Sequence, residues 1–436
     1  MSEVRSFART ESVQVRRHEP ASYGHLLGLL RSDKARSIRG AGLSYCLASA
    51  ADGVDCISTG AFNRVLEFDR ERRLIRVEPG LAIGDLVSVV CASGLWFPVL
   101  PGYPSITIGG CVAMNVHGKT QHNVGNFAEH VESLVLLHPD HGELHCSTTS
   151  HADLFDLTLG GFGLTGYIAE VTLRLQPLAG TAVRRVAHRV RSLDDAVATM
   201  DDLATKTDAL YSWNDFNRPG ASFGAGLVYA EYFVDGEEPE PEPARSMPTL
   251  PGWLPRRSAY SAVTMPLINR VYEVRDRLRP TRIGGVVQTA FPIAGNEIYF
   301  HLYGGRGFYE YQWIVPRPSL AVAIARLREA VAATRATITL GSLKLFAGSQ
   351  SLLRFDGDGV CITLDAVDHP ATAALFARLD RLVIEHGGVV NIAKDSRLSA
   401  DVVARVFPEY RDFRSRLRDF DPHRRFDTSL RRRIDV

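Results

Sequence analysis

Two glycine-bearing loops, at residues 39–45 and 101–119, place the strongest constraint on the fold of this chain. The first reads RGAGLSY and the second PGYPSITIGGCVAMNVHGK, and each follows an apolar run typical of a strand. Glycine lets the main chain approach a ligand closely, and successive backbone N–H groups in such turns can surround a phosphate. The two loops therefore predict a site for the diphosphate of a nucleotide cofactor.

Neither loop has the GxGxxG spacing of a dinucleotide-binding turn, and the phosphate loop GxxxxGK(S/T) does not occur in the chain. A different kind of cradle is therefore needed. Any one glycine of these loops, taken singly, can also be part of an ordinary tight turn. Five of them in two loops favour the cofactor interpretation: Gly40, Gly42, Gly102, Gly109 and Gly110.

Two further segments, GGFGLTG at 160–166 and AKDSR at 393–397, belong to the same pattern. With both loops they resemble the flavin-linked oxidases of the vanillyl-alcohol oxidase superfamily, in which the FAD diphosphate lies between two such loops. Within that superfamily the chain is most similar to the decaprenylphosphoryl-β-D-ribose 2'-oxidase family, the flavin half of a ribose-to-arabinose epimerase. The motifs that carry this similarity are HGK at 117–119, YQW at 311–313, KLF at 344–346 and KDSR at 394–397.

The resemblance implies an α+β chain with a two-domain PCMH-type FAD-binding fold. We expect an FAD-binding domain at 1–178, a substrate domain at 179–392, and a C-terminal segment at 393–436 that returns to the FAD-binding domain. The substrate domain is expected to be an antiparallel sheet covered by helices, because predicted strands alternate with helices without enough βα repeats for a barrel. The predicted strands are 308–315, 338–346 and 360–366, and the predicted helices are 319–333 and 370–386.

Local signals predict further elements. Ser22 is placed as the N-cap of a short helix, and Ser192 as the N-cap of another. Alternation predicts hairpins within 62–77 and 131–146. The proline-rich stretch 237–255 reads either as a mobile flap over the substrate or as a surface loop with no role.

The resemblance assigns a set of residues to the flavin. They are Arg39, Gly40, Ala41, Gly42, Leu43, Ser44, Tyr45, Gly102, Thr107, Ile108, Gly109, Gly110, Met114, Asn115, Val116, His117, Gly163, Ile168 and Asn391. Some members of the superfamily attach the flavin to a histidine in the first glycine loop. Leu43 occupies that place here, so we expect FAD to be bound non-covalently. His117 is expected beside the flavin, or else is a buried histidine satisfied by backbone groups.

Lys394 and Lys344 are the strongest candidates for catalysis. Oxidising a secondary alcohol by hydride transfer needs a group that takes or holds the hydroxyl proton, while the cofactor performs the redox chemistry. Lys394 follows an apolar pair, and Lys344 interrupts a largely uncharged strand. Buried lysines are rare unless they are paired or functional. Both also match lysines near the substrate or flavin in the family.

Alternation in the strand 308–315 places Glu310 and Gln312 on one polar face, which must meet water or a ligand. We include both as catalytic candidates, with His117 and with Tyr45, which is either an active-site tyrosine or a packing aromatic. The family has glutamine where Glu310 stands, so this departure adds negative charge near a phosphorylated sugar. Thr363 and Asn391 are further departures, from a cysteine and a tyrosine.

Composition excludes several classes of function. A net charge of +1 gives no reason to expect nucleic acid, and the six cysteines have no spacing typical of a metal site. No signal peptide or apolar span is recognisable, so we expect a cytoplasmic protein. The tail from 411 to 433, with nine arginines and four aspartates, is either a patch for anionic lipid or a solvated surface.

The sequence therefore predicts an FAD-dependent oxidoreductase acting on a CH–OH group. The leading hypothesis is oxidation of the 2'-OH of polyprenylphosphoryl-β-D-ribofuranose, with an NAD(P)H-dependent short-chain reductase as partner in arabinose biosynthesis. The alternatives are an enzyme for a soluble sugar, polyol or nucleoside, and a non-catalytic flavin-fold scaffold. Peripheral membrane contact is expected if the substrate is lipid-linked.

Overall fold

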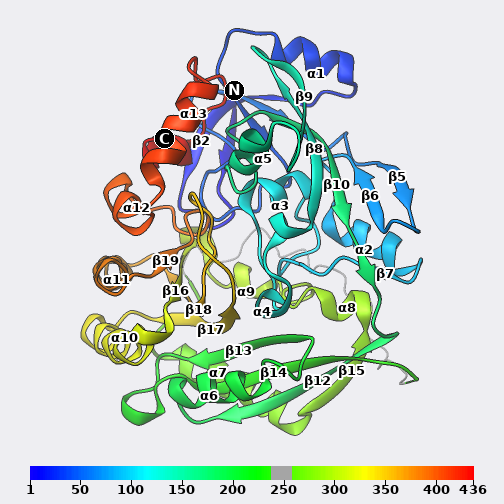
Figure 1. Cartoon of the computed structure of the whole chain (residues 1–436). Coiled ribbons are helices and arrows are strands. Elements are labelled where there is room, and N and C mark those ends of the chain that lie inside the picture. The colour runs from blue at the N-terminus through cyan, green and yellow to red at the C-terminus, as the bar shows by residue number, and fades with distance from the viewer. Residues whose placement is uncertain (237–257) are drawn as a thin grey trace.

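The computed structural model describes residues 1–236 and 258–436 of the chain (Figure 1). The stretch 237–255, predicted as a flap or surface loop, lies outside these residues. Four main sheets organise the described chain, and their helices and strands mix in the manner of an α+β protein. None of the described helices combines the length and the apolar character that crossing a membrane requires.

The first sheet carries the first glycine loop. Its strand order is β1-β2-β4-β3, with β1 antiparallel to β2 and the other neighbours parallel. The strands are β1 (Ser2–Arg5), β2 (Ser12–His18), β3 (Arg36–Arg39) and β4 (Asp55–Ser58). Helix α1 (Tyr23–Leu30) begins as predicted, because the Ser22 side chain accepts the His25 backbone N–H at 3.3 Å. The strands β1 and β2 were not expected from the sequence.

The second sheet, in the order β5-β6-β10-β8-β9, supports the second glycine loop. Both predicted hairpins are confirmed here, as β5–β6 and β8–β9. Apolar faces of α2 and α3 pack on this sheet and form one core with it. The elements of this region are β5 (Val65–Asp69), β6 (Leu74–Val77), α2 (Ile83–Cys91), β7 (Leu95–Trp96), α3 (Ile108–Met114), α4 (Gln121–Val124), β8 (Val131–His138), β9 (Gly142–Ser147), α5 (Ala152–Thr158), β10 (Tyr167–Arg174) and β11 (Gln176–Pro177).

A third sheet, β13-β14-β12-β15, has helices on both faces. Helix α6 packs on one face through its apolar residues, and α7 covers the other. Ser192 caps α6 as predicted. The elements are β12 (Ala182–Val190), α6 (Leu193–Leu203), β13 (Ala209–Asp215), β14 (Ala225–Val234), α7 (Thr264–Leu278), β15 (Thr281–Gly285), α8 (Val286–Ala290) and α9 (Ile298–His301). The sequence pattern did not resolve this sheet from the next one.

The fourth sheet, β17-β18-β16-β19, is fully antiparallel. Helices α10 and α11 cover one of its faces, where Tyr311 and Trp313 join the largest core (Figure 1). The other face carries Glu310 and Gln312, as the alternation predicted. The elements are β16 (Phe308–Val315), α10 (Leu320–Thr334), β17 (Ile338–Phe346), β18 (Gly359–Val367), α11 (Pro370–His386) and β19 (Val389–Val390).

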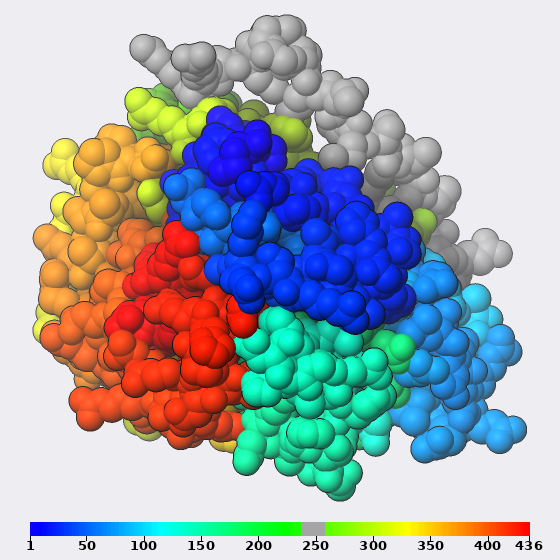
Figure 2. Space-filling view, turned by 90° about the horizontal axis from the view of Figure 1, so that it is seen from above, coloured from blue at the N-terminus to red at the C-terminus, as the bar shows by residue number. Residues whose placement is uncertain are grey.

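The C-terminal segment packs against the start of the chain. It contains α12 (Ala400–Val406), α13 (Tyr410–Phe420) and α14 (Ser429–Ile434). Phe426 forms a parallel bridge with Arg36 of β3, and the Leu430 backbone N–H donates to the carbonyl of Leu47 at 3.1 Å. Figure 2 shows the two ends of the chain, blue and red, side by side on the face seen from above.

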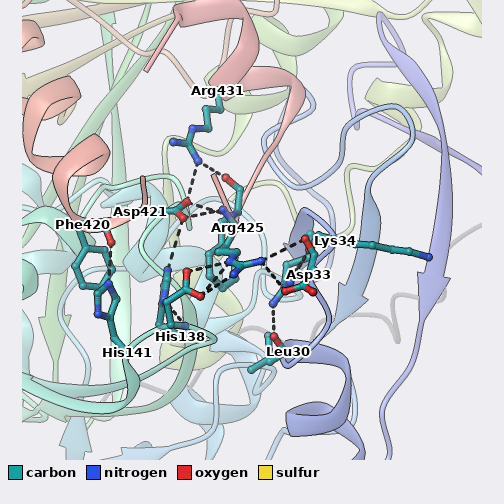
Figure 3. A network of polar contacts seen from close by, with 12 residues as sticks. Leu30, Asp33, Lys34, His138, His141, Phe420, Asp421, Arg425 and Arg431 are labelled. Atoms are coloured by element: carbon teal, nitrogen blue, oxygen red, sulfur yellow. Dashed lines mark hydrogen bonds and ion pairs between the residues drawn. The ribbon is translucent and has the colours of Figure 1, made fainter. Parts of the chain in front are cut away.

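Ion pairs tie this segment to the second sheet (Figure 3). Arg425 pairs with Asp140 of the β8–β9 turn at 2.8 Å, and within the C-terminal segment Arg431 pairs with buried Asp421 at 3.1 Å. His138 Nε2 lies 3.9 Å from Asp421. His138, Asp140 and Asp421 are close enough together to hold a metal ion, but arginines already neutralise both carboxylates. We therefore assign this cluster a structural role.

Ion pairs occupy several of the tail arginines that were candidates for binding anionic lipid. The arginines that pair with aspartates of the described chain are Arg414, Arg416, Arg425, Arg431 and Arg432. Much of the positive charge that was a candidate for lipid binding is therefore used inside the protein.

Candidate active site

The first glycine loop presents a row of backbone amides without acceptors. It follows β3 directly, and among the described residues no acceptor receives the N–H groups of residues 40–45. The loop is mostly half-buried, so leaving these donors unsatisfied is costly unless a ligand accepts from them. Gly42 has φ +71°, a left-handed conformation that glycine adopts without strain. Such a nest of donors suits an anionic phosphate.

The second loop touches the first through Gly40. A Cβ atom on Gly40 would lie 2.1 Å from Thr107 Oγ1, so only glycine allows this approach. Thr107 precedes α3, and a Cβ on Gly109 would lie 2.8 Å from the side chain of Pro79. The Gly109 contact holds the second loop against Pro79, and the Gly40–Thr107 contact joins the two loops. The amide row and this contact fit the diphosphate of FAD.

The other expected flavin residues lie in more varied settings. Arg39 Nη1 donates to Ser49 Oγ at 2.8 Å, while Ile168 is buried in the core of the second sheet. The carbonyl of Gly102 accepts the Ile293 N–H at 3.2 Å. Asn115 is left-handed and buried, and its Nδ2 has no partner among the described residues. The half-buried expected residues are Arg39, Gly40, Gly42, Leu43, Ser44, Gly102, Gly109, Gly110, Met114, Val116, His117, Gly163 and Asn391, and Ala41 is exposed.

His117, which follows α3, belongs to a hydrogen-bonded chain across the fourth sheet. Its Nε2 lies 3.2 Å from Gln312 Oε1, which also accepts from Asn391 Nδ2 at 2.6 Å. Gln312 Nε2 donates to Thr363 Oγ1 at 3.1 Å. Burial, and next the charge of Lys344, lower the pKa of His117 well below its usual range. The imidazole is therefore neutral at physiological pH.

Lys394 forms a second group with Glu310 and Tyr45. Its Nζ lies 3.4 Å from Glu310 Oε1 and 3.6 Å from the centre of the Tyr45 ring. Glu310 is 4% exposed, so Lys394 supplies a needed counter-charge to its carboxylate. Burial raises the pKa of the Tyr45 hydroxyl well above its ordinary value. The cation rests on the aromatic face, a favourable arrangement.

Lys344 interacts electrostatically with both His117 and Lys394. It lies opposite Cys361 in the β17–β18 register, on the sheet face that carries Gln312. Burial lowers the pKa of the Lys344 amine, and the charge of Lys394 acts in the same direction. A lysine with lowered pKa can accept a proton near neutral pH. Three groups thus meet at this sheet face: the Lys394 cation, the Lys344 amine of reduced basicity and the neutral His117 imidazole.

The structure adds residues that the sequence analysis did not select. Asp365 lies opposite Glu310 in the β16–β18 register and is 1% exposed. Its Oδ2 accepts the Tyr299 hydroxyl at 2.7 Å. Burial, and then Glu310, raise the pKa of Asp365 well above its usual range. An aspartate in the apolar run 360–366 is as unusual as Lys344 in its strand, and that signal could have identified it.

The chain resembles known flavoproteins. Residues 26–147 match the family model described as an FAD binding domain. Over 91% of this chain and 88% of the relative, it is 29% identical to a protein named decaprenylphosphoryl-beta-D-ribose oxidase from Mycolicibacterium smegmatis. The chain belongs to the decaprenylphosphoryl-β-D-ribose oxidase family of FAD-linked oxidases. It is therefore an FAD-dependent oxidoreductase with a PCMH-type FAD-binding fold.

Two further relatives extend this comparison. An uncharacterised protein in the mprA 5' region of Streptomyces coelicolor is 31% identical over 82% of this chain and all of its own length. L-gulonolactone oxidase from mouse is 31% identical over 37% of each chain. FAD is thus the cofactor of this family member, and the amide row and glycine contacts described above are where its diphosphate fits.

Proposed function

We propose that this enzyme oxidises a secondary hydroxyl of a furanose, namely the 2'-OH of a polyprenylphosphoryl-β-D-ribofuranose, to the 2'-keto sugar. The observation that carries the proposal is the sheet face on which Lys394, Lys344, Gln312 and His117 meet next to the two glycine loops. The name of the mycobacterial relative supports the substrate. When bound, FAD supplies the acceptor for the hydride.

The protein residues have separate roles in this proposal. Lys344, whose pKa is lowered by burial, takes the hydroxyl proton. Lys394, fixed by Glu310 and by the Tyr45 ring, stabilises the negative charge that develops on the sugar oxygen. Gln312 holds the neutral His117 imidazole at its Nε2 atom and thereby sets its orientation. Each role uses a group that the fold already holds in place.

We further propose the domain assignment expected from the sequence. Residues 1–178 form the FAD-binding domain, 179–392 the substrate domain, and 393–436 carry Lys394 back to the flavin. FAD is bound non-covalently, since Leu43 stands where attachment would occur. The keto product is then the substrate of an NAD(P)H-dependent reductase.

Glu310 favours a second candidate, a soluble sugar, polyol or nucleoside. Its buried carboxylate would repel a phosphate group placed close to it. Lys394 offsets this charge in the first proposal. In the second, Glu310 instead accepts hydrogen bonds from an uncharged polyol.

Anaerobic reduction of the bound flavin separates the two. Purified protein is first precipitated with acid, and colour released to the supernatant supports non-covalent FAD. Another sample of the protein, not treated with acid, is mixed anaerobically with a lipid-phosphoryl ribose and, separately, with ribose, arabinose, sugar alcohols and nucleosides. Bleaching by the lipid-phosphoryl ribose supports the first proposal. Bleaching by a free sugar alone contradicts it and supports the second.

A further inference from the structure

Helix α7 is oriented opposite to an ordinary surface helix. It buries Glu273 and Asp276, which are 3% and 1% exposed. Its outer face carries Leu267, Val271 and Leu278, which are 68%, 61% and 76% exposed. A surface helix of a globular protein normally turns its apolar side inward. The outward side of α7 is therefore an apolar stripe without a partner among the described residues.

Ion pairs fix this orientation. Glu273 pairs with Arg218 at 2.7 Å. Asp276 accepts the Tyr229 hydroxyl at 2.8 Å and pairs with Arg282 at 3.2 Å. Rolling the helix to hide its apolar side would leave these carboxylates without partners, at a large cost. The exposed stripe is thus a stable feature of the fold.

The same face carries positive charge only. Both carboxylates of α7 are buried, whereas Arg270, Arg275 and Arg277 are exposed, and so is Arg279 just after the helix. Arg270 and Arg275 pair with Glu273 and Asp276, so Arg277 and Arg279 are the arginines of this face for which the described residues provide no ion pair. The surrounding region is unusually apolar as well. Of the eleven large hydrophobic side chains exposed in the described chain, six lie between 263 and 298: Val263, Leu267, Val271, Leu278, Val287 and Ile298. Apolar residues interspersed with arginines match the interface of an anionic bilayer.

The stripe lies next to the candidate active site. Met265, on the inner side of α7, belongs to a buried cluster with Tyr45, Tyr303 and Phe308. The Tyr45 ring in that cluster carries Lys394 on its face. Ile298, exposed at the start of α9, precedes Tyr299, which packs against the same cluster. A bilayer against α7 would therefore be separated from Lys394 by the helix itself and by the buried cluster that contains Met265 and Tyr45.

We propose that the outer face of α7 docks on an anionic phospholipid surface. Leu267 and Val271 enter the interfacial region, and the arginines contact lipid phosphates. A second copy of the chain is a poorer occupant, because a two-fold contact would bring arginines against arginines. The arginine-rich tail is a poorer docking surface, because none of the exposed large hydrophobic side chains of the described chain lies on it. That the docked enzyme draws its substrate from the bilayer rests on the proposed function.

Vesicle sedimentation of the FAD-loaded protein tests the proposal. The vesicles contain phosphatidylcholine alone, or phosphatidylcholine and phosphatidylglycerol in equal parts. We expect binding to the anionic vesicles that weakens as salt is added. The double variant Leu267→Glu/Val271→Glu should lose at least about tenfold in affinity, and Arg277→Glu/Arg279→Glu a similar amount. The matched control is Val322→Glu, at an exposed valine on α10.

Each outcome decides the question. Loss of binding in the two α7 variants, with flavin content and melting temperature unchanged and with Val322→Glu unaffected, supports docking through α7. Equal binding by all variants, or no preference for anionic vesicles, overturns it. A dimer in analytical ultracentrifugation that Leu267→Glu/Val271→Glu dissociates, without vesicle binding, assigns the face to a second copy. Binding through α7 without flavin reduction by a lipid-phosphoryl ribose leaves the docking proposal standing and contradicts the proposed substrate.

Discussion

Lys394 Nζ lies 3.4 Å from Glu310 Oε1, although the two residues belong to the C-terminal segment and to a central strand. The pair brings a cation from the last part of the chain onto the polar face of the fourth sheet. Because Glu310 is buried, each charge needs the other. This pair underlies the first prediction.

Lys394→Ala is expected to abolish turnover while the protein still folds and binds FAD, at a cost in stability because buried Glu310 loses its counter-charge. Loss of the cation removes the charge that stabilises the reacting oxygen, and removing one such group typically costs about 100-fold or more in rate. Stopped-flow measurement of anaerobic flavin reduction gives the rate. Lys206→Ala, at an exposed lysine paired with Asp202, is the control. Normal reduction in Lys394→Ala would exclude Lys394 from the mechanism.

Gly40→Ala is expected to prevent FAD binding. Its Cβ would lie 2.1 Å from Thr107 Oγ1, so the two loops would separate and the amide row would lose its geometry. Flavin absorbance per mole of purified protein measures the effect. Adding Thr107→Ala removes the colliding oxygen and should restore part of the binding. Gly24→Ala, at a position with open space around it, should bind FAD normally. Full binding by Gly40→Ala alone would refute the close contact of the loops.

The stability of the C-terminal junction should fall in acid because of His138. Burial is the main cause that lowers the pKa of His138 to about 4, whereas in the unfolded chain it is about 6.5. The unfolded state therefore binds the proton first. The stability is fully present above pH 6.5 and is lost as pH falls toward 4, by about 3 kcal/mol at about 1.4 kcal/mol per pKa unit.

Urea unfolding of the FAD-loaded protein at pH 7.5 and pH 4.5 measures this effect. His138→Gln should lose less stability between the two pH values than the wild type, because glutamine does not titrate. His145→Gln, at an exposed histidine, should behave as the wild type does. The same pH dependence in all three proteins would mean that His138 does not contribute.

The sequence was informative where local chemistry decides the structure. Ser22 and Ser192 cap their helices through side-chain hydrogen bonds, and alternation placed Glu310 and Gln312 on one sheet face. These features depend on a few neighbouring residues. The family resemblance supplied the cofactor, which the matching FAD binding domain supports.

Features that depend on partners distant in sequence could not be predicted. Helix α7 has an apolar stripe, so its pattern alone would place Leu267 inside. Its orientation is set instead by the pairing of Glu273 with Arg218. Likewise, Asp365 gains its role only because the register places it opposite Glu310. Pairing across strands and between sheets is a tertiary property, and a single sequence does not reveal it.

Asp365→Asn is expected to stabilise the protein at alkaline pH. Burial and the neighbouring Glu310 raise the pKa of Asp365 well above its unfolded value, which is about 3.9. The folded state therefore holds the proton more tightly. The contribution of Asp365 to the stability of the folded state is therefore fully present below pH 3.9, and it is lost as the pH rises through the pKa of Asp365 in the folded state. Asparagine keeps an oxygen that can accept the Tyr299 hydroxyl and carries no charge.

Urea unfolding at pH 4 and pH 8 checks this expectation on FAD-loaded protein. Relative to the wild type, Asp365→Asn should be more stable at pH 8 than at pH 4 by at least about 1.4 kcal/mol, the equivalent of one pKa unit. Asp202→Asn, at an exposed aspartate, should show no such difference. If Asp365→Asn changes stability equally at both pH values, Asp365 is not protonated in the folded enzyme, and the carboxyl pair with Glu310 carries two negative charges that Lys394 and Lys344 must balance.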